Sequence, residues 1–272
     1  MRRARKQRGF TIVETLIVLA VTGLMFLLAV VAINGKQNQA EFNQAINDIR
    51  SQVQQEIDQV AAGDYPNTNN FTCNGTLGTL KILPGTNKQG SNDGCVYLGK
   101  VLQFGVHGNG ASPQQYISYT IAGLQDNNGS LTAAKPTAIA PGITTNVGGS
   151  FPNASVTNIL HNGLTVVKMT SGGNNIGAVA FISNLGQYSG GSLLSGSQQI
   201  SLIPVTGSYW DKTSRETVDA INKNLATSTQ NPSGGVQICF ASGGTQQSGL
   251  MTIGSGGRNL SVTVEIKDGR NC

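Results

Sequence analysis

Residues 10–33 read FTIVETLIVLAVTGLMFLLAVVAI, an apolar run that contains one charged residue, Glu14. As an α-helix, these 24 residues would span about 36 Å, which is enough to cross a bilayer. Five basic residues and no acidic residue precede the run: Arg2, Arg3, Arg5, Lys6 and Arg8. Basic residues beside a membrane helix keep that end in the cytoplasm. The sequence therefore predicts a single-pass protein whose bulk lies outside the cell.

Three interpretations of this segment compete. A secretory signal peptide also joins a basic start to an apolar stretch, and Val30-Val31-Ala32 would be its cleavage site. That stretch would be too long, however, and it would carry a carboxylate near its start. A plain membrane anchor fits the length but leaves Glu14 unexplained, because an unpaired carboxylate in a membrane helix costs about 3 kcal/mol on insertion scales. A precursor that is cut just before the helix explains both features.

Residues 8–14, Arg-Gly-Phe-Thr-Ile-Val-Glu, resemble the processing site of type IV prepilins. The resemblance implies that a prepilin peptidase removes the basic leader, residues 1–9, by cutting between Gly9 and Phe10. It also implies N-methylation of the new terminus at Phe10. Glu14 then becomes the fifth residue of the mature chain, the position at which the family carries its glutamate.

The family role of this glutamate has a physical basis. Cleavage creates an α-amino group at Phe10, charged at neutral pH, at the tip of a membrane helix. The resemblance implies that Glu14 neutralises this amine on a neighbouring subunit in a filament of parallel helices. Pairing removes the cost of burying either charge alone, so assembly is favoured and the axial register is fixed.

One departure from the family concerns the shape of the helix. Many members carry a proline near the position of Val31, and this chain has none. Gly23 lies within the apolar run and Gly35 follows it, and glycine costs about 1 kcal/mol relative to alanine inside a helix. We therefore expect any bend or local melting at Gly23 or near Asn34-Gly35.

The helix is predicted to continue as an amphipathic extension over residues 35–62, beyond a membrane-spanning or filament-core part at 10–34. Its apolar side chains recur every three or four residues, at Phe42, Ile46, Ile49, Val53, Ile57 and Val60. Charged residues lie off this stripe. Gly63-Asp64-Tyr65-Pro66 ends the helix. The stripe is expected to pack against a globular head formed by residues 63–272.

The head is predicted to be β-rich and extracellular, which gives an α+β pilin fold with a long helix against an antiparallel sheet. Residues 67–95 are expected to form a loop, 125–162 an irregular insertion or lobe boundary, and Thr213–Ala226 a short capped helix. Strand-like composition occurs at 96–106, 115–122, 163–169, 176–183 and 199–205. A closing antiparallel meander is predicted from the segments 235–241, 250–253 and 260–267.

Four cysteines all follow the apolar segment, where an oxidising compartment favours disulfides. The sequence alone allows three pairings. We favour Cys73–Cys95 and Cys239–Cys272, because each closes a local loop, and each would contribute about 3 kcal/mol by loop entropy. Free buried thiols are the alternative.

Charge and motifs argue against other classes of protein. Five of the eighteen basic residues precede Phe10, and the remaining thirteen balance thirteen acidic ones, so no dedicated nucleic-acid site is expected. His107 and His161 lie apart from any partner at catalytic spacing, and no nucleophile, metalloprotease or phosphate-binding motif is present. We expect no enzyme activity, no cofactor and no metal site, and we interpret Asp126 as a solvated turn and Trp210 as a packing residue.

The resemblance implies a structural subunit of a type IV pilus-like filament, a homo-oligomer with helical order. Its implied partners are the prepilin peptidase, a platform membrane protein and assembly ATPases. The subunit would reside in the cytoplasmic membrane before assembly and in an extracellular pilus afterwards. The alternatives are a minor or tip pilin that acts as an adhesin, and a secretion or competence pseudopilin. Adhesion, motility and DNA uptake are not distinguished by the sequence.

Overall fold

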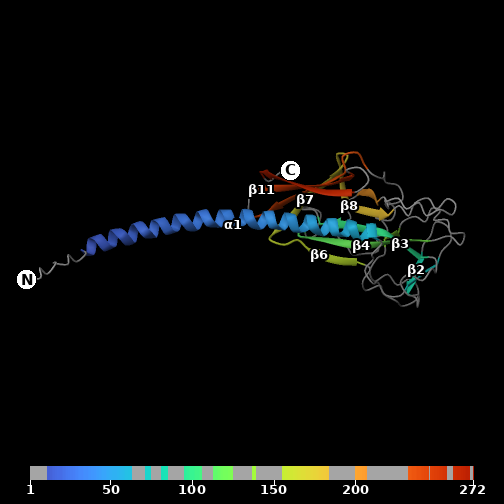
Figure 1. The fold of residues 1–272 in the computed structure, drawn as a ribbon, viewed down its shortest axis with the longest axis horizontal. Coiled ribbons are helices and arrows are strands. Elements are labelled where there is room, and N and C mark those ends of the chain that lie inside the picture. Colours follow the sequence, from blue (N-terminus) through green and yellow to red (C-terminus); the bar gives the residue numbers. More distant parts are fainter. Residues whose placement is uncertain are drawn as a thin grey trace, which may run out of the picture.

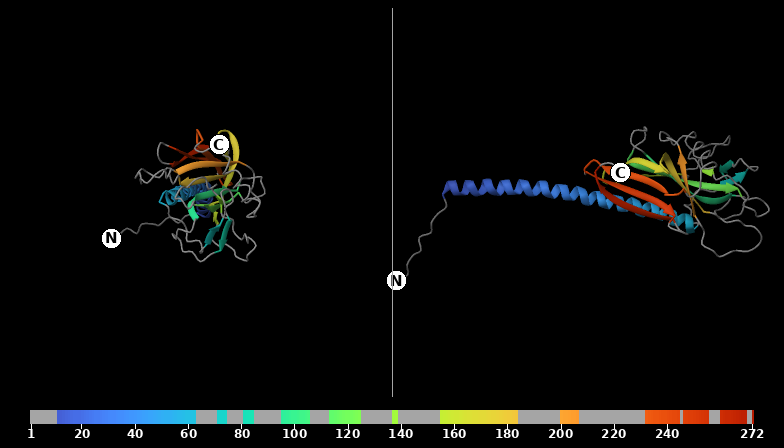
Figure 2. Two further views of the ribbon diagram at one scale, coloured as in Figure 1. Left: turned by 90° about the vertical axis from the view of Figure 1, so that its right-hand side faces the viewer. Right: turned by 90° about the horizontal axis from the view of Figure 1, so that it is seen from above.

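A computed structural model describes twelve parts of the chain: residues 11–62, 71–74, 81–84, 95–105, 113–124, 137–138, 155–183, 200–206, 232–244, 246–255, 260–269 and 272. They form one long helix followed by strands (Figure 1). The N-terminal half of the helix projects away from the sheet, and its C-terminal half lies along it. The right-hand view of Figure 2 shows the same projection from above. The predicted α+β architecture, a long N-terminal helix against an antiparallel sheet, is confirmed.

Helix α1 runs from Ile12 to Ala62 without interruption. Its end agrees with the predicted stop signal, whose own residues lie outside the described parts. Within the single chain, helical structure continues through both Gly23 and Gly35. A glycine weakens a helix but keeps its N–H donor, whereas a proline removes one. The chain has no proline here, so the ladder of hydrogen bonds remains intact.

The main sheet has ten strands, joined in antiparallel pairs along the order β12-β11-β10-β7-β8-β3-β4-β5, with β6 beside β4 and β9 beside β8. Strands β1 and β2 form a separate antiparallel pair. The bounds of the strands are β1 Phe71–Asn74, β2 Lys81–Pro84, β3 Cys95–Phe104, β4 Gln115–Leu124, β5 Thr137–Ala138, β6 Ser155–Ile159, β7 Leu164–Ser171, β8 Asn174–Ser183, β9 Ile200–Thr206, β10 Val236–Ser242, β11 Gln247–Ser255 and β12 Leu260–Asp268.

The β7–β8 hairpin joins two parts of this sheet. Only two residue pairs link the strands, Thr170 with Asn175 and Ser171 with Asn174. Gly172 and Gly173 form the turn with positive φ angles, a conformation that glycine adopts without steric cost. Beyond the turn, β8 leaves β7 and pairs with β9 on one side and β3 on the other. The C-terminal meander therefore lies in one part, and the strands β9, β8, β3 and β4 lie in the other.

All eight segments with strand-like composition are strands, and the closing meander of β10, β11 and β12 is confirmed. Four strands were not predicted. Strands β1 and β2 lie in the stretch 67–95, which was expected to be a loop, and β5 and β6 lie in the irregular stretch 125–162. Both β5 and β6 extend the sheet by pairing with β4. The helix predicted at Thr213–Ala226 lies outside the described residues.

The principal core lies between α1 and the sheet. All six side chains of the predicted stripe, from Phe42 to Val60, are at most 2% exposed, and Ala45 is buried with them. They pack against apolar side chains from both parts of the sheet, including Phe104, Phe181 and Phe240. Burial of this stripe is the main force that holds the helix on the head, because each large apolar side chain contributes about 1.5–3 kcal/mol.

A second core covers the opposite face of β3, β4, β8 and β9. Side chains of β8 alternate between the two cores. Val179 and Phe181 belong to the core between α1 and the sheet. Ala178, Ala180 and Ile182 belong to the second core. Successive side chains of a strand point to opposite faces, so this part of the sheet is buried on both sides. Its strands accordingly lack the polar alternation of a half-exposed sheet.

Helix α1 lies close to the sheet at Gly249 of β11. A Cβ atom at this position would lie 2.6 Å from Cδ1 of Ile46, whose side chain is fully buried. Overpacking of this kind costs about 1–3 kcal/mol. We therefore expect Gly249→Ala to destabilise the head by that amount in a urea titration.

Ile46→Val tests the cause, because it removes only the Cδ1 atom that a new methyl group would meet. Alone, it should cost about 0.5–1.5 kcal/mol. Combined with Gly249→Ala, it should recover most of the loss, so that the two changes are strongly non-additive. Simple additivity of the two costs would show that Gly249 does not set the distance between helix and sheet.

Candidate functional site: the assembly helix and its attachment to the sheet

The start of α1 is capped by Thr11. Its hydroxyl oxygen accepts a hydrogen bond from the backbone N–H of Glu14 at 3.3 Å, and its carbonyl accepts the first helical bond from Thr15. Thr11 and Glu14 are spaced as in a capping box, in which the glutamate occupies the third helical position. The Thr-x-x-Glu spacing in the sequence is the signal that could have predicted this cap. Glu14 is thus held in the first turn, where the helix dipole favours a negative charge.

Glu14 is exposed within the structure, as is the apolar segment around it. Large side chains from Ile12 to Ile33 are exposed to an extent that is unusual for a folded chain, for example 69% at Phe26 and 72% at Val31. Helix α1 has the length and hydropathy needed to cross a membrane, and its most apolar window buries nothing against the rest of the chain. An apolar surface of this size requires a lipid or protein environment.

Gly9 and Phe10, the predicted processing residues, lie outside the described residues. Cleavage and methylation at this bond therefore stay predictions. The same holds for the pairing of Glu14 with a second copy, because the structure contains a single chain. What the structure adds is the rigid helical frame on which Glu14 lies.

Polar contacts fix the C-terminal half of α1 to the sheet. Near the middle of α1, the side-chain amide of Asn38 donates to the carbonyl of Gly244 at 3.2 Å. Further along, Nε of Arg50 donates to the carbonyl of Val262 in β12 at 3.0 Å. The amide of Asn162 donates to the helix carbonyl of Glu41 at 3.3 Å. These bonds attach the helix to three different loops and strands.

An ion pair lies between the last turns of α1 and strand β3. The ammonium of Lys100 contacts the carboxylate of Glu56 and also donates to the amide oxygen of Gln59. The Lys100 side chain is 6% exposed and the Glu56 side chain 17% exposed, so Lys100 has little access to water. Beside the pair, the hydroxyl of Tyr116 donates to Oε1 of Gln52 at 3.0 Å. Burial, together with the charge of Glu56, raises the pKa of Tyr116 far above its usual value, so the phenol remains a neutral donor.

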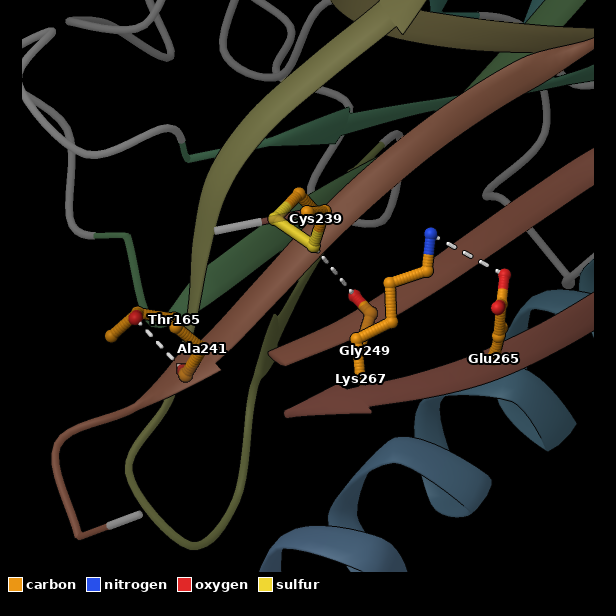
Figure 3. Close-up of a disulfide and its surroundings, with 7 residues drawn as sticks. Thr165, Cys239, Ala241, Gly249, Glu265 and Lys267 are labelled. Carbon is orange, nitrogen blue, oxygen red and sulfur yellow. Dashed lines mark hydrogen bonds and ion pairs between the residues drawn. A yellow bond between two sulfur atoms is a disulfide. The ribbon is translucent and has the colours of Figure 1, made fainter. Parts of the chain in front are cut away.

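A disulfide joins Cys239 in β10 to Cys272, the last residue, with a Cα–Cα distance of 5.7 Å. This is the pairing that the sequence favoured. Figure 3 shows it beside β11, where Sγ of Cys272 lies 3.5 Å from the carbonyl oxygen of Gly249. The side chains of Cys73 and Cys95 lie outside the described part of the structure, so their pairing stays a prediction.

The residues weighed for catalysis give no assembled site in the described ranges. His161 is exposed in the turn between β6 and β7, where its carbonyl accepts a hydrogen bond from Leu164. His107, Asp126 and Trp210 lie outside those ranges. A search for groups of three or more metal-ligating side chains, confined to the described residues, finds none.

Comparison with known proteins gives one result. Residues 4–30 match the family described as the prokaryotic N-terminal methylation motif. No curated protein and no solved structure matches the chain. The chain therefore carries a type IV prepilin-like leader, consistent with a protein of the pilin or pseudopilin type, which is a structural and non-enzymatic type. The leader implies processing by a prepilin peptidase and pilus-type assembly, and with the apolar helix it indicates anchoring in a membrane.

Proposed function

We propose that this chain, with its type IV prepilin-like leader, is a structural subunit of a type IV pilus-like surface filament. The observation that carries the proposal is the helix. The N-terminal half of α1 projects from the head, and its large apolar side chains, from Ile12 to Ile33, are exposed within the described part of the subunit. In the membrane, lipid covers them; after assembly, the helices of other copies do.

The proposed sequence of events starts at the membrane. The basic leader, residues 1–9, keeps the N-terminus in the cytoplasm while the head folds outside. The peptidase cuts between Gly9 and Phe10, and Phe10 is methylated. A platform membrane protein and assembly ATPases then add the subunit to the base of a filament, where Glu14 pairs with the N-terminal amine of another copy. The mature subunit is extracellular and has a formal charge close to zero.

Mass spectrometry of filaments sheared from cells tests the proposal. We expect the predominant species to begin at N-methylated Phe10 and to contain the intact head. If filaments contain this chain with residues 1–9 still attached, or if the unprocessed precursor is the only form in the cell, the proposal is wrong. Abundance in the same sample separates a main subunit from a scarce tip adhesin. Absence of the processed chain from sheared surface filaments would favour the pseudopilin alternative.

A further inference from the structure

Between residues 36 and 50, helix α1 carries four charged residues: Lys36, Glu41, Asp48 and Arg50. All four are exposed, whereas the stripe from Phe42 to Val60 is buried against the head. Glu56, in contrast, lies toward the sheet and is paired with Lys100. The four exposed charges therefore contribute little to the attachment of the helix, apart from the hydrogen bond of Arg50 to Val262.

These four charges are separated by sign. Side chains on an α-helix are about 100° apart per residue, so Lys36 and Arg50 lie within about 40° of each other around the axis. Glu41 and Asp48 lie within about 20° of each other, and Glu41 is about 140° from Lys36. The exposed surface thus has a basic flank (Lys36 and Arg50) and an acidic flank (Glu41 and Asp48). Between them lie the uncharged exposed residues Gln37, Ala40, Gln44 and Ser51. Further toward the end of the helix, the exposed Asp58 also lies between the flanks, and its carboxylate accepts a hydrogen bond from the side-chain amide of Gln54 at 3.0 Å.

None of these four charges has an oppositely charged partner among the described residues. The carboxylate of Glu41 accepts a hydrogen bond from the neutral side-chain amide of Gln37, at 2.9 Å. Arg50 uses Nε for the carbonyl of Val262, which leaves its two terminal nitrogens. A basic flank and an acidic flank on one helix are complementary to each other but cannot meet within one chain. A second copy of the same helix can bring them together.

We infer that the basic flank of one copy binds the acidic flank of a second, parallel copy, with Lys36 of one opposite Glu41 of the other. The inference rests on the proposed function, which requires parallel copies because every apolar segment enters the same membrane. The pairing needs an axial stagger of five residues, or about 7.5 Å. At this stagger Arg50 lies level with Gln55, whose amide oxygen accepts hydrogen bonds. Each copy uses two different surfaces, so the contact repeats without closing and produces a filament.

Charge reversal tests the pairing in cells that make this chain as their filament subunit. Lys36→Glu and Glu41→Lys should each lower the amount of sheared filament at least tenfold, because each places like charges at every contact. The double variant Lys36→Glu/Glu41→Lys restores opposite charges and should recover filaments to within about threefold of the unmodified chain. Lys168→Glu, at an exposed position of β7, is the matched control and should leave the yield unchanged.

Cross-linking provides a second measurement that does not depend on yield. Cells that make a mixture of Lys36→Cys and Glu41→Cys subunits should give disulfide-linked dimers in sheared filaments, and Lys36→Cys alone should give none. The pairing is wrong if the unmodified chain forms filaments with methylated Phe10 while the double reversal is no better than the single reversals and the mixed dimer is missing. The absence of filaments from the unmodified chain would instead contradict the proposed function itself.

Discussion

Glu14→Ala is expected to leave processing intact and to reduce incorporation into filaments at least tenfold. The bond between Gly9 and Phe10 is unchanged, so the peptidase should still produce the mature chain. The new α-amino group of Phe10 would then be placed among apolar helices without a counter-charge. An unpaired charge in such surroundings costs about 3 kcal/mol on insertion scales, which corresponds to roughly 100-fold in the equilibrium of each addition step.

Glu14→Gln is the informative control for this variant. Its backbone N–H can still bond to the Thr11 hydroxyl, and its side chain keeps the size and hydrogen-bonding capacity of glutamate, but it lacks the charge. Loss of filaments in both variants, with mature chain present in the membrane by immunoblot, supports charge pairing. Normal filaments from either variant as the only subunit would contradict it. Accumulation of precursor would show that Glu14 acts at the processing step.

Glu56→Gln should lower the free energy of unfolding of the head by about 3 kcal/mol. The change keeps an acceptor for Lys100 but removes its counter-charge, and a Lys100 side chain that is 6% exposed has almost no access to water. Removal of one partner of a buried ion pair typically costs about 3–5 kcal/mol. Lys100→Met should cost less, because the carboxylate of Glu56, at 17% exposed, can turn toward solvent.

The double variant Glu56→Gln/Lys100→Met completes the comparison. With both charges removed, stability should return to within about 1 kcal/mol of the unmodified chain, because no buried charge remains unpaired. Urea titration of the chain in detergent, read by pulse proteolysis, measures all four free energies. If Glu56→Gln costs less than about 1 kcal/mol, the ion pair is not what fixes the last turns of α1 to β3. If the double variant is as unstable as the worse single variant, Lys100 is needed for packing and not for charge.

Helix α1 and its buried stripe could be predicted from the sequence because both depend on local patterns. Apolar residues at helical spacing from Phe42 to Val60 indicate a helix and also indicate which side is buried. The meander from β10 to β12 was found for a similar reason, since its strands are consecutive and separated by short turns. Periodicity over a short range is sufficient in these cases.

The remaining elements depend on contacts between distant residues. Strand β6 pairs with β4 about forty residues away, and nothing in its own five residues requires that pairing. Lys100 shows the same limit, because lysine in a strand is ordinarily exposed, and only the helix packed across β3 brings Glu56 and Gln59 to its ammonium.

In the candidate site, too, some residues could be recognised from the sequence and others only from the structure. Glu14 was evident from sequence, because a single carboxylate in an apolar run is conspicuous. Its cap by Thr11 was also visible in the sequence, although it became clear only with the hydrogen bond. The charges on the two flanks of α1 could be recognised as unpaired only when the structure showed which side of the helix the sheet covers.

If the proposed filament forms, the link between Cys239 and Cys272 has a mechanical consequence under tension. A pull along such a fibre enters each subunit through α1 and reaches the sheet partly through β12, whose carbonyl at Val262 is held by Arg50. Strand β12 stands at the edge of the sheet, beside β11, so its hydrogen bonds to β11 would otherwise carry this part of the load. The covalent loop that closes between these cysteines, 33 residues apart, ties the end of the chain back to β10. The load is then expected to be shared by β10, β11 and β12, so that the separation of β12 from β11 is resisted.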